Sequence, residues 1–308
     1  MRKISVVIPA LNEEQGIGSV LKEIPVGTLM NMGYETEVLV IDNGSKDKTG
    51  YIARQQGATV IIQPVKGYGN AYKAGFANAS GDIIATGDAD LTYPFEDLPE
   101  IIKKMEKEEL DFVSTNRMEY VNPVVMAPSH IFGNKLLTTI TRVLFDLPFV
   151  DSQSGMWVFR KEIWDKMNVR SSGMSFSQEL KIEAHLRGFK CAEVPIKYRV
   201  RAGDAKLNTM KDGAKVMFHL FHKRLSTLFL VKNIEDENEK APIFIDTIGA
   251  MDATATELHS HTHSDEQGVF SLNLTEGFAI PMRESENRVQ SPQHLPEIKV
   301  SSKSKHLY

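Results

Sequence analysis

The stretch GDIIATGDADLTYP, residues Gly81 to Pro94, joins a short run that is apolar on both faces to a polar turn. Asp88 and Asp90 stand one residue apart where the run ends. Alternate residues of a strand point to the same side, so both carboxylates can face one spot. Two like charges so close are unfavourable unless a cation neutralises them. A solvated turn is the alternative, but the position after a buried strand favours a hard divalent ion, Mg2+ or Mn2+.

Other runs of the same kind occur along the first half of the chain, and helical patterns separate them. This alternation indicates a mostly parallel sheet covered by helices on both faces. The sequence therefore predicts an α/β fold of the doubly wound kind, in which ligands bind at the carboxyl ends of the strands. The predicted strands are Ile4–Pro9, Glu37–Asp42, Ala58–Gln63, Asp82–Gly87 and Asp111–Thr115, and the predicted helices are Gln15–Ile24, Lys48–Gln56, Tyr68–Ala79 and Phe95–Glu108.

Polar clusters follow the first four predicted strands and should meet at one crevice. Asn12 and Glu13, in PALNEE, could cap the next helix or contact a base or ribose. Asp42 could accept hydrogen bonds from the same groups. In VKGYGNAYKAG, a tyrosine occupies the third glycine position of the dinucleotide fingerprint, which argues against that motif. We expect Gly67 to let the backbone approach a ligand and Lys66 to add positive charge near a phosphate.

The bulk composition narrows the classes of function. The chain has 308 residues and a formal net charge of -4, which argues against a general nucleic-acid binder. Its single cysteine excludes an intramolecular disulfide. We find neither a signal peptide nor a run of the ~18 apolar residues that a membrane helix needs. We therefore expect a cytoplasmic protein, with a folded domain over residues 1–233 and a polar, disordered tail over 234–308.

Five motifs follow one another along the chain: VVIPALNEE, VLVIDNGSKDKT, GYGNAYKAGFANASGDIIATGDADLTYP, DSQSGMWVFR and EVPIKYRVRAGDAKL. Together they resemble the family 2 glycosyltransferases, in particular dolichyl-phosphate mannose synthases and related polyprenyl-phosphate hexosyltransferases. The resemblance covers Ile4 to Leu225. It implies a GT-A fold, a donor of the GDP-mannose or UDP-glucose type, and a divalent metal on the Asp-x-Asp element.

The resemblance also implies roles for individual residues. The first two motifs would contact the nucleoside through Pro9, Asn12, Glu13 and Asp42. Asp88 and Asp90 would hold the metal and the diphosphate. Arg117 and Arg201 match positions that contact phosphate in the family, and the loop of Asp151 would border the acceptor site. Lys206 is a further cation available to bind the donor.

The sequence departs from the family pattern at three places. Asn43 stands where a second acid is usual, which would alter contacts to the base or ribose. Thr92 replaces a common glutamine and is a neutral but shorter oxygen donor, and we predict it as a third metal ligand. Ala205 replaces a serine in the last motif, although Arg201 and Lys206 are kept.

Two acceptor chemistries fit these motifs. A lipid monophosphate is already anionic and needs only cations, whereas a sugar or small-molecule hydroxyl needs a carboxylate base, either Asp151 or Glu179. A third hypothesis is a non-catalytic scaffold that binds nucleotide sugars. For a lipid acceptor we expect peripheral contact with the cytoplasmic face of the membrane. Residues 132–145 and 216–231 are apolar stripes typical of interfacial helices and of core helices alike, and we favour the core.

Overall fold

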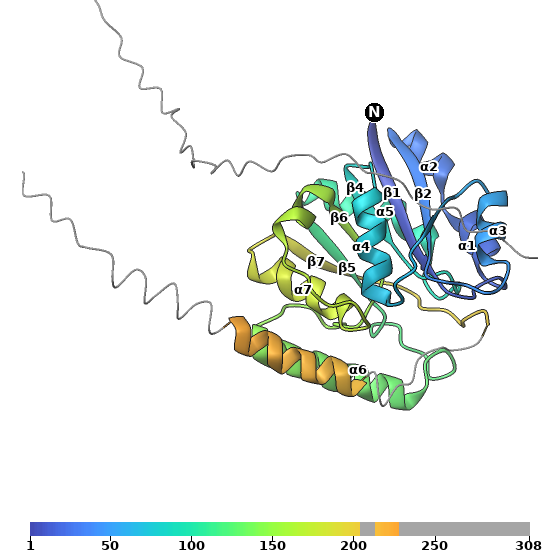
Figure 1. Ribbon diagram of the computed structural model, residues 1–308. Helices are drawn as coiled ribbons and strands as arrows, with labels where there is room; N and C mark the ends of the chain where they lie inside the picture. The colour runs from blue at the N-terminus through green and yellow to red at the C-terminus, as the bar shows by residue number, and fades with distance from the viewer. Residues whose placement is uncertain (204–212, 228–308) are drawn as a thin grey trace, which may run out of the picture. The chain divides into compact units, whose positions relative to one another are not determined.

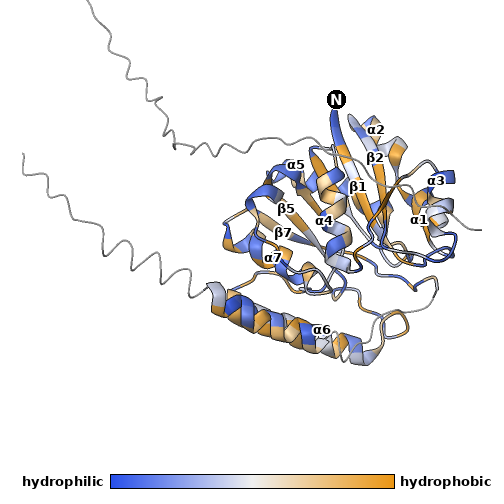
Figure 2. Cartoon of the chain, viewed as in Figure 1, coloured by the Kyte–Doolittle hydropathy of each residue, from blue (hydrophilic) through white to orange (hydrophobic). Residues whose placement is uncertain are grey.

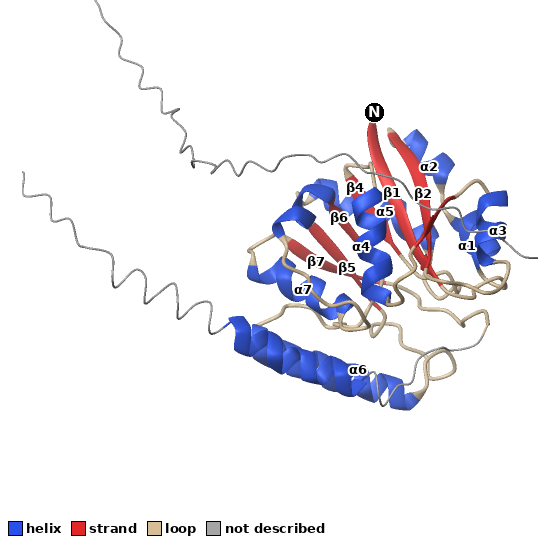
Figure 3. Cartoon of the chain, viewed as in Figure 1, coloured by secondary structure: helices blue, strands red, loops and turns tan. Residues whose placement is uncertain are grey.

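The computed structural model describes residues 1–203 and 213–227. A seven-stranded sheet lies at the centre of this part, in the order β3-β2-β1-β4-β6-β5-β7, with helices on both faces (Figures 1 and 3). The strands are β1 Arg2–Ala10, β2 Tyr34–Asp42, β3 Thr59–Ile62, β4 Ile83–Thr86, β5 Phe112–Asn116, β6 Trp157–Arg160 and β7 Cys191–Pro195. The helices are α1 Ile17–Glu23, α2 Val26–Asn31, α3 Thr49–Gln55, α4 Tyr68–Asn78, α5 Leu98–Lys107, α6 Pro128–Phe145 and α7 Phe176–Leu186, with 3-10 helices η1 Phe95–Asp97 and η2 Lys161–Lys166.

The central strand β1 explains why the chain forms layers. Val6 and Ile8 point to one face of the sheet and Val7 to the other, and all three are fully buried. Each such side chain contributes about 1.5–3 kcal/mol relative to exposure. β1 pairs in parallel with β2 on one side and with β4 on the other, so both faces need cover. The predicted α/β fold with a mostly parallel sheet is confirmed.

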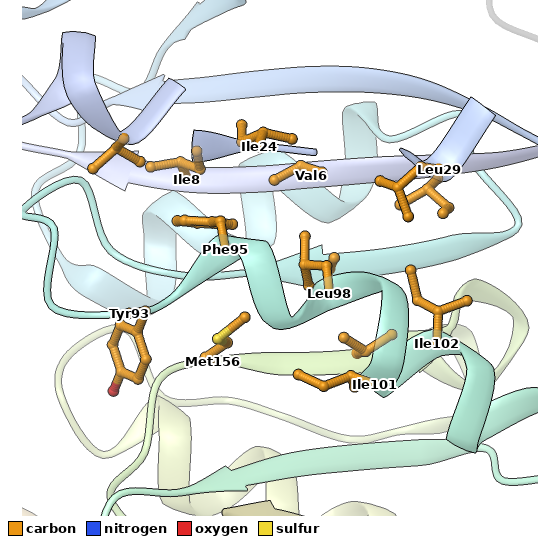
Figure 4. Packing of buried hydrophobic residues seen from close by; sticks show 14 of the residues in the cluster. Val6, Ile8, Ile24, Leu29, Tyr93, Phe95, Leu98, Ile101, Ile102 and Met156 are labelled. Atoms are coloured by element: carbon orange, nitrogen blue, oxygen red, sulfur yellow. The ribbon is translucent and has the colours of Figure 1, made fainter. Parts of the chain in front are cut away.

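Each face of the sheet has its own core. On one face, Val6 and Ile8 of β1 pack near Phe95 and the apolar side of α5, as Figure 4 shows. Helices α1, α2 and α3 contribute to the same cluster. On the other face, α4 and α7 bury aromatic rings, and Tyr72 stacks on Phe176 with ring centroids 5.6 Å apart. The two cores hold the carboxyl ends of β1, β2 and β4 in fixed register.

Two features of the fold differ from the sequence pattern or add to it. β6 lies between β4 and β5 and runs antiparallel to both, although β4 and β5 are successive strands in the chain. The six-residue helix α2 has no predicted counterpart, because it is too short to show helical periodicity.

Two helices lie outside the main layers. α6 and a helix whose described part covers residues 213–227 lie together (Figure 1), and the Arg224 guanidinium sits 6.0 Å from the Phe145 ring centroid. Leu137 and Ile140 pack against the second core, which includes Leu220. Figure 2 shows apolar and polar residues alternating along α6. Among the described residues, no helix is both long enough and apolar enough to cross a membrane.

Some sequence predictions fall outside the described residues. Lys206 belongs to the segment 204–212, and the tail 234–308 lies in the segment 228–308. The boundary at residue 233 therefore stays a prediction.

Candidate active site

A cavity of about 250 Å³ opens at the carboxyl ends of β1, β2 and β4. We call it the strand-end cavity. Its position is the one that the doubly wound fold predicts for a ligand. The residues that line it are Pro9, Ala10, Leu11, Glu13, Asn43, Lys66, Gly67, Tyr68, Ala71, Asp88, Ala89, Met174 and Arg201. Six predicted site residues are therefore brought together: Pro9, Glu13, Lys66, Gly67, Asp88 and Arg201.

The loops after β1 and β2 are tied to each other. The Asn12 Oδ1 atom accepts a hydrogen bond from the Lys46 amide at 2.7 Å, and the Glu13 amide donates to Thr49 Oγ1 at 2.7 Å. Asp42 is buried and accepts from the Ser45 amide at 2.8 Å. Asn12 and Asp42 are not among the residues that line the strand-end cavity. Both side chains shape the loops that border it, and their contact with a nucleoside stays a prediction.

Asn43 has a structural reason to be an amide. Its Nδ2 atom donates to the carbonyls of Gln63 and Val65 at 3.0 and 2.9 Å, and its Oδ1 atom accepts from the Gly67 amide at 2.8 Å. An aspartate could replace only the last of these bonds, because a carboxylate cannot donate. The departure from the family pattern thus fixes the loop before α4 against β2.

Gly67 is a glycine because another backbone lies against it. Its φ is 143°, and a Cβ atom there would sit 2.3 Å from the Ser172 carbonyl oxygen. A Cβ atom on Gly69 would sit 2.5 Å from the Ser171 carbonyl oxygen. The chain itself therefore makes a close approach to Gly67, and the approach of a ligand stays a prediction. Lys66 remains at the cavity wall beside Gly67.

Asp88 presents a carboxylate to the strand-end cavity. Its Oδ1 atom accepts a hydrogen bond from the Tyr68 hydroxyl at 3.2 Å. Burial, and then the neighbouring charge of Asp90, raise the pKa of Asp88 well above its usual range. A positive charge that enters the cavity would stabilise the ionised form of Asp88.

Asp90 lies behind Asp88 and is almost wholly buried. Its Oδ2 atom forms an ion pair with Arg201, and its Oδ1 atom accepts from the Thr92 hydroxyl at 2.5 Å and the Thr92 amide at 3.1 Å. Arg201 lines the strand-end cavity and therefore links Asp90 to it. The Thr92 hydroxyl is directed to Asp90, and its role as a third metal ligand stays a prediction.

The residues at this edge fit a divalent cation that is shared with a substrate. Among the described residues, no group of three histidine, cysteine, aspartate or glutamate side chains could hold a metal. Mg2+ and Mn2+ often need only one or two carboxylates when phosphate oxygens supply further ligands. Asp88 and Asp90 provide hard oxygen donors of this kind, and they would hold the ion.

Arg117 and Asp151 pair with each other away from the cavity lining. The guanidinium donates from Nε to Oδ2 at 2.7 Å and from Nη2 to Oδ1 at 2.9 Å. Asp151 is fully buried and also accepts from the Arg117 amide, from Asn134 and from the Gln153 amide. Burial opposes its ionisation, but the charge and hydrogen bonds of Arg117 hold the pKa of Asp151 well below its usual range.

The sequence did not single out several residues that support this pair. Lys181 of α7 is fully buried, and its ammonium donates to the carbonyls of Asp151 and Ser154 at 2.7 and 3.0 Å. Glu193 accepts from the Asp151 amide at 3.0 Å. The Arg117 guanidinium also lies 5.2 Å from the Tyr198 ring centroid. None of these contacts has a local sequence signal, since each joins distant segments.

Besides Asn43, six residues that line the cavity were not predicted as site residues: Ala10, Leu11, Tyr68, Ala71, Ala89 and Met174. Tyr68 stands between two glycines at the start of α4, and that position could have marked it as a ligand-facing side chain. Met174 lies in the loop before α7 and carries no comparable signal.

The fold and the site define an α/β protein with a cavity, lined by charged side chains of both signs, at the carboxyl ends of its central strands. A family model described as Glycosyl transferase family 2 matches residues 5–167. The chain belongs to this family, as its motifs predicted.

Curated relatives agree with the family assignment. The chain is 40% identical over 212 residues to the low-salt glycan biosynthesis hexosyltransferase Agl6 of Haloferax volcanii, a match that covers 68% of this chain and 51% of that protein. The chain thus spans about half the length of this relative. It is 36% identical over 214 residues to the dolichyl-phosphate hexose transferase of the same organism, covering 69% of this chain and 90% of the relative.

Solved structures share the fold. Glucosyl-3-phosphoglycerate synthase from Mycobacterium tuberculosis, crystallised with Mn2+, uridine diphosphate and glucosyl-3-phosphoglycerate, superposes with a TM-score of 0.58. The two chains are 26% identical, and the match covers 72% of this chain and 80% of that one. The predicted GT-A fold is confirmed by this likeness.

Proposed function

We propose that the chain is an inverting hexosyltransferase that moves a hexose from a nucleoside-diphosphate sugar to a polyprenyl phosphate. The observation that carries the proposal is the charge pattern of the strand-end cavity. The carboxylate of Asp88 shares this cavity with Lys66 and Arg201. A diphosphate with a divalent cation is complementary to both signs of charge, whereas a neutral ligand is complementary to neither.

The donor side of the proposal has support from a structural relative. Glucosyl-3-phosphoglycerate synthase holds Mn2+ and uridine diphosphate in the same fold. In our chain, Pro9 and Glu13 at the end of β1 would face the nucleoside, and Lys66 and Arg201 would bind phosphate oxygens. A divalent cation, when bound, would neutralise the charge that develops on the leaving diphosphate.

The proposed acceptor follows from the contacts of the two carboxylates that could act as a base. Asp151 is fully buried in its pair with Arg117, and Glu179 is bound to Ser171 and Lys223. A general base must be within reach of the proton that it removes, so these contacts do not favour a hydroxyl acceptor. A phosphate monoester needs no base, and a relative is named for transfer of a hexose to dolichyl phosphate.

An exposed apolar surface on α6 and the helix 213–227 supports a lipid acceptor. Phe132 is 70% exposed and Val143 is 80% exposed on α6, while Phe218 is 75% exposed on the second helix. Leu136, Phe221 and Leu225 are also exposed. The sequence favoured a core role for these helices, but each divides into a packed side and an exposed apolar side. Such helices bind at the membrane interface, so we propose peripheral contact there.

A thermal-shift screen tests the donor. The protein is heated with GDP-sugars and UDP-sugars, each with and without Mn2+. We expect one nucleotide sugar to raise the Tm by several degrees only when Mn2+ is present, because the cation neutralises both Asp88 and the diphosphate. Stabilisation that is independent of the metal would contradict the role of Asp88 and Asp90.

A transfer assay then tests the acceptor. The donor found in the screen is incubated with a polyprenyl phosphate in vesicles, or with a panel of sugar hydroxyl acceptors. Product on the lipid phosphate alone supports the proposal. Product on a hydroxyl acceptor alone contradicts it and restores the alternative in which Asp151 acts as a base.

A further inference from the structure

The loop of residues 168–175, which we call the wall loop, forms one side of the strand-end cavity. Met174 of this loop lines the cavity. The Ser172 carbonyl accepts from the Asn70 amide at 3.2 Å and lies against Gly67, which leaves no space for a Cβ atom. The Arg170 carbonyl accepts from the Lys73 ammonium at 2.8 Å. The position of the wall loop therefore decides the shape of the cavity beside α4.

Two carboxylates of α7 hold the wall loop from the other side: Glu183 accepts from the Asn168 amide at 2.8 Å, and Glu179 makes the larger set of contacts. Glu179 is 1% exposed. Its Oε2 atom accepts from the amides of Arg170 and Ser171 at 3.1 and 2.7 Å, and from the Ser171 hydroxyl at 2.5 Å. A buried carboxylate is costly unless cations and donors compensate it. The charge of Glu179 thus needs a partner for the loop to stay in place.

That partner comes from the helix 213–227. The Lys223 ammonium lies 3.1 Å from Glu179 Oε1 and 2.5 Å from Glu183 Oε1, and it donates to the Asn168 carbonyl at 3.2 Å. The His219 Nε2 atom lies 2.9 Å from the Ser171 hydroxyl and 3.5 Å from Glu179 Oε2. Burial opposes ionisation of Glu179, yet hydrogen bonds from His219 and Ser171 hold its pKa well below the usual range.

We infer that Lys223 and His219 are positioning residues for the ligand of the strand-end cavity. Their side chains bond to Asn168, Ser171, Glu179 and Glu183, none of which lines the cavity, so they would act through Glu179 and the wall loop. The inference rests on the proposed function for the identity of the ligand, a nucleoside diphosphate. It places a requirement for donor binding on two helix residues, His219 and Lys223, that each lie more than forty residues beyond the wall loop in sequence.

Lys223 should contribute more than His219 to the position of the wall loop, because it compensates more buried negative charge. Lys223 is 9% exposed and faces two acids, Glu179 and Glu183. Its removal leaves buried negative charge that the protein relieves by admitting water or by moving the loop. Removal of His219 breaks the contact to the Ser171 hydroxyl but leaves the ion pair with Lys223. The first change should therefore disturb the cavity more than the second.

The test compares two pairs of variants on the full chain. Lys223→Met is matched by Lys215→Met, and His219→Ala is matched by His222→Ala; both control side chains are exposed on the same helix. Lys223→Arg tests rescue by a second cation. The Kd of UDP and of GDP with Mn2+ is measured by calorimetry, and the KM values for donor and acceptor are measured separately.

We expect Lys223→Met to weaken diphosphate binding about tenfold and His219→Ala about threefold, with a matching rise of the donor KM. The acceptor KM should stay constant, and Lys223→Arg should recover most of the affinity. The two control variants should bind as the unchanged protein does. A merely structural role would lower the Tm without this division between donor and acceptor.

The outcomes separate the two proposals. If the unchanged protein binds neither diphosphate, the proposed function fails, whatever the variants do. If it binds one of them and folded Lys223→Met binds it equally well, the positioning role is overturned. If Lys223→Met does not fold, His219→Ala decides: weaker binding than in His222→Ala supports the inference, and equal binding overturns it.

Discussion

The strand-end cavity and the Arg117–Asp151 pair use the same residue types in opposite ways. Asp88 lines the cavity, and the hydroxyl of Tyr68 donates to it at 3.2 Å. Asp151 is fully buried and accepts five hydrogen bonds, three of them from Arg117. A carboxylate has about four lone-pair sites, so Asp151 has no capacity left for a ligand or a proton.

The difference separates charged groups that can bind a ligand from charged groups that stabilise the fold. A charged group beside a cavity is costly without a ligand and is suited to binding one. A charged group inside a saturated network fixes the backbone around it. We therefore propose that the buried pair of Arg117 and Asp151 supports the acceptor side of the site, and that Asp88 and Arg201, which line the cavity, serve the donor side. The predictions below test this division.

The largest effect should follow from Asp151→Asn. The change leaves the buried Arg117 guanidinium without its counter-charge, which should lower the free energy of unfolding by about 3–5 kcal/mol. Urea denaturation measures the loss. An unchanged unfolding free energy combined with lost transfer would show that Asp151 acts in the chemistry, as a base for a hydroxyl acceptor.

Asp88→Asn should have the reverse profile. The change relieves repulsion between Asp88 and Asp90, so the Tm should stay constant or rise. Transfer should fall about a hundredfold, because the cation that stabilises the leaving diphosphate loses a ligand. Calorimetry should show weaker Mn2+-dependent binding of the diphosphate. A variant that kept this binding would remove Asp88 from the site.

Asn43→Asp tests a side chain that combines both roles, since Asn43 lines the cavity and also holds the loop before α4 by its hydrogen bonds. The variant restores the acid that is usual in the family. Its carboxylate, however, has no hydrogen to donate to the carbonyls of Gln63 and Val65. We expect a loss of about 1–3 kcal/mol in unfolding free energy. Higher donor affinity with no loss of stability would mean that the acid is preferred for binding.

The smallest effect concerns an acid of the sheet that does not line the strand-end cavity. Burial opposes ionisation of Glu37, but hydrogen bonds from Ser5 and Ser80 lower its pKa to about 2. Since the folded pKa lies below the ordinary value of 4.5, Glu37 stabilises the fold above that pH. The contribution, about 1 kcal/mol after solvent screening, is lost as the pH falls from about 4.5 to about 2.

Urea denaturation across this pH range, with Glu37→Gln as the comparison, measures the effect. The unchanged protein should lose its advantage over the variant as the pH falls. An advantage that does not change with pH would show that the hydrogen bonds of Glu37 do not depend on its charge.

Much of the strand-end cavity was predictable because its signals are local. The alternation of apolar runs and helices predicted the sheet, and polar residues at strand ends placed Glu13, Lys66 and Asp88 at one edge. The reason given for Gly67 was incomplete, because the backbone of the wall loop, a hundred residues away in sequence, presses against it. A pattern that is local in the chain cannot reveal such a contact.

The sequence by itself determined the layered α/β fold, the edge of the sheet that carries the site and the family. These follow from periodicity and from motifs within single segments. Only the tertiary structure decided that Asp151 forms an ion pair with Arg117, that Asn43 holds the loop before α4, and that Lys223 compensates the charge of Glu179. Each of these is a pairing of buried polar groups, and burial is a property of the whole packed chain rather than of any stretch within it.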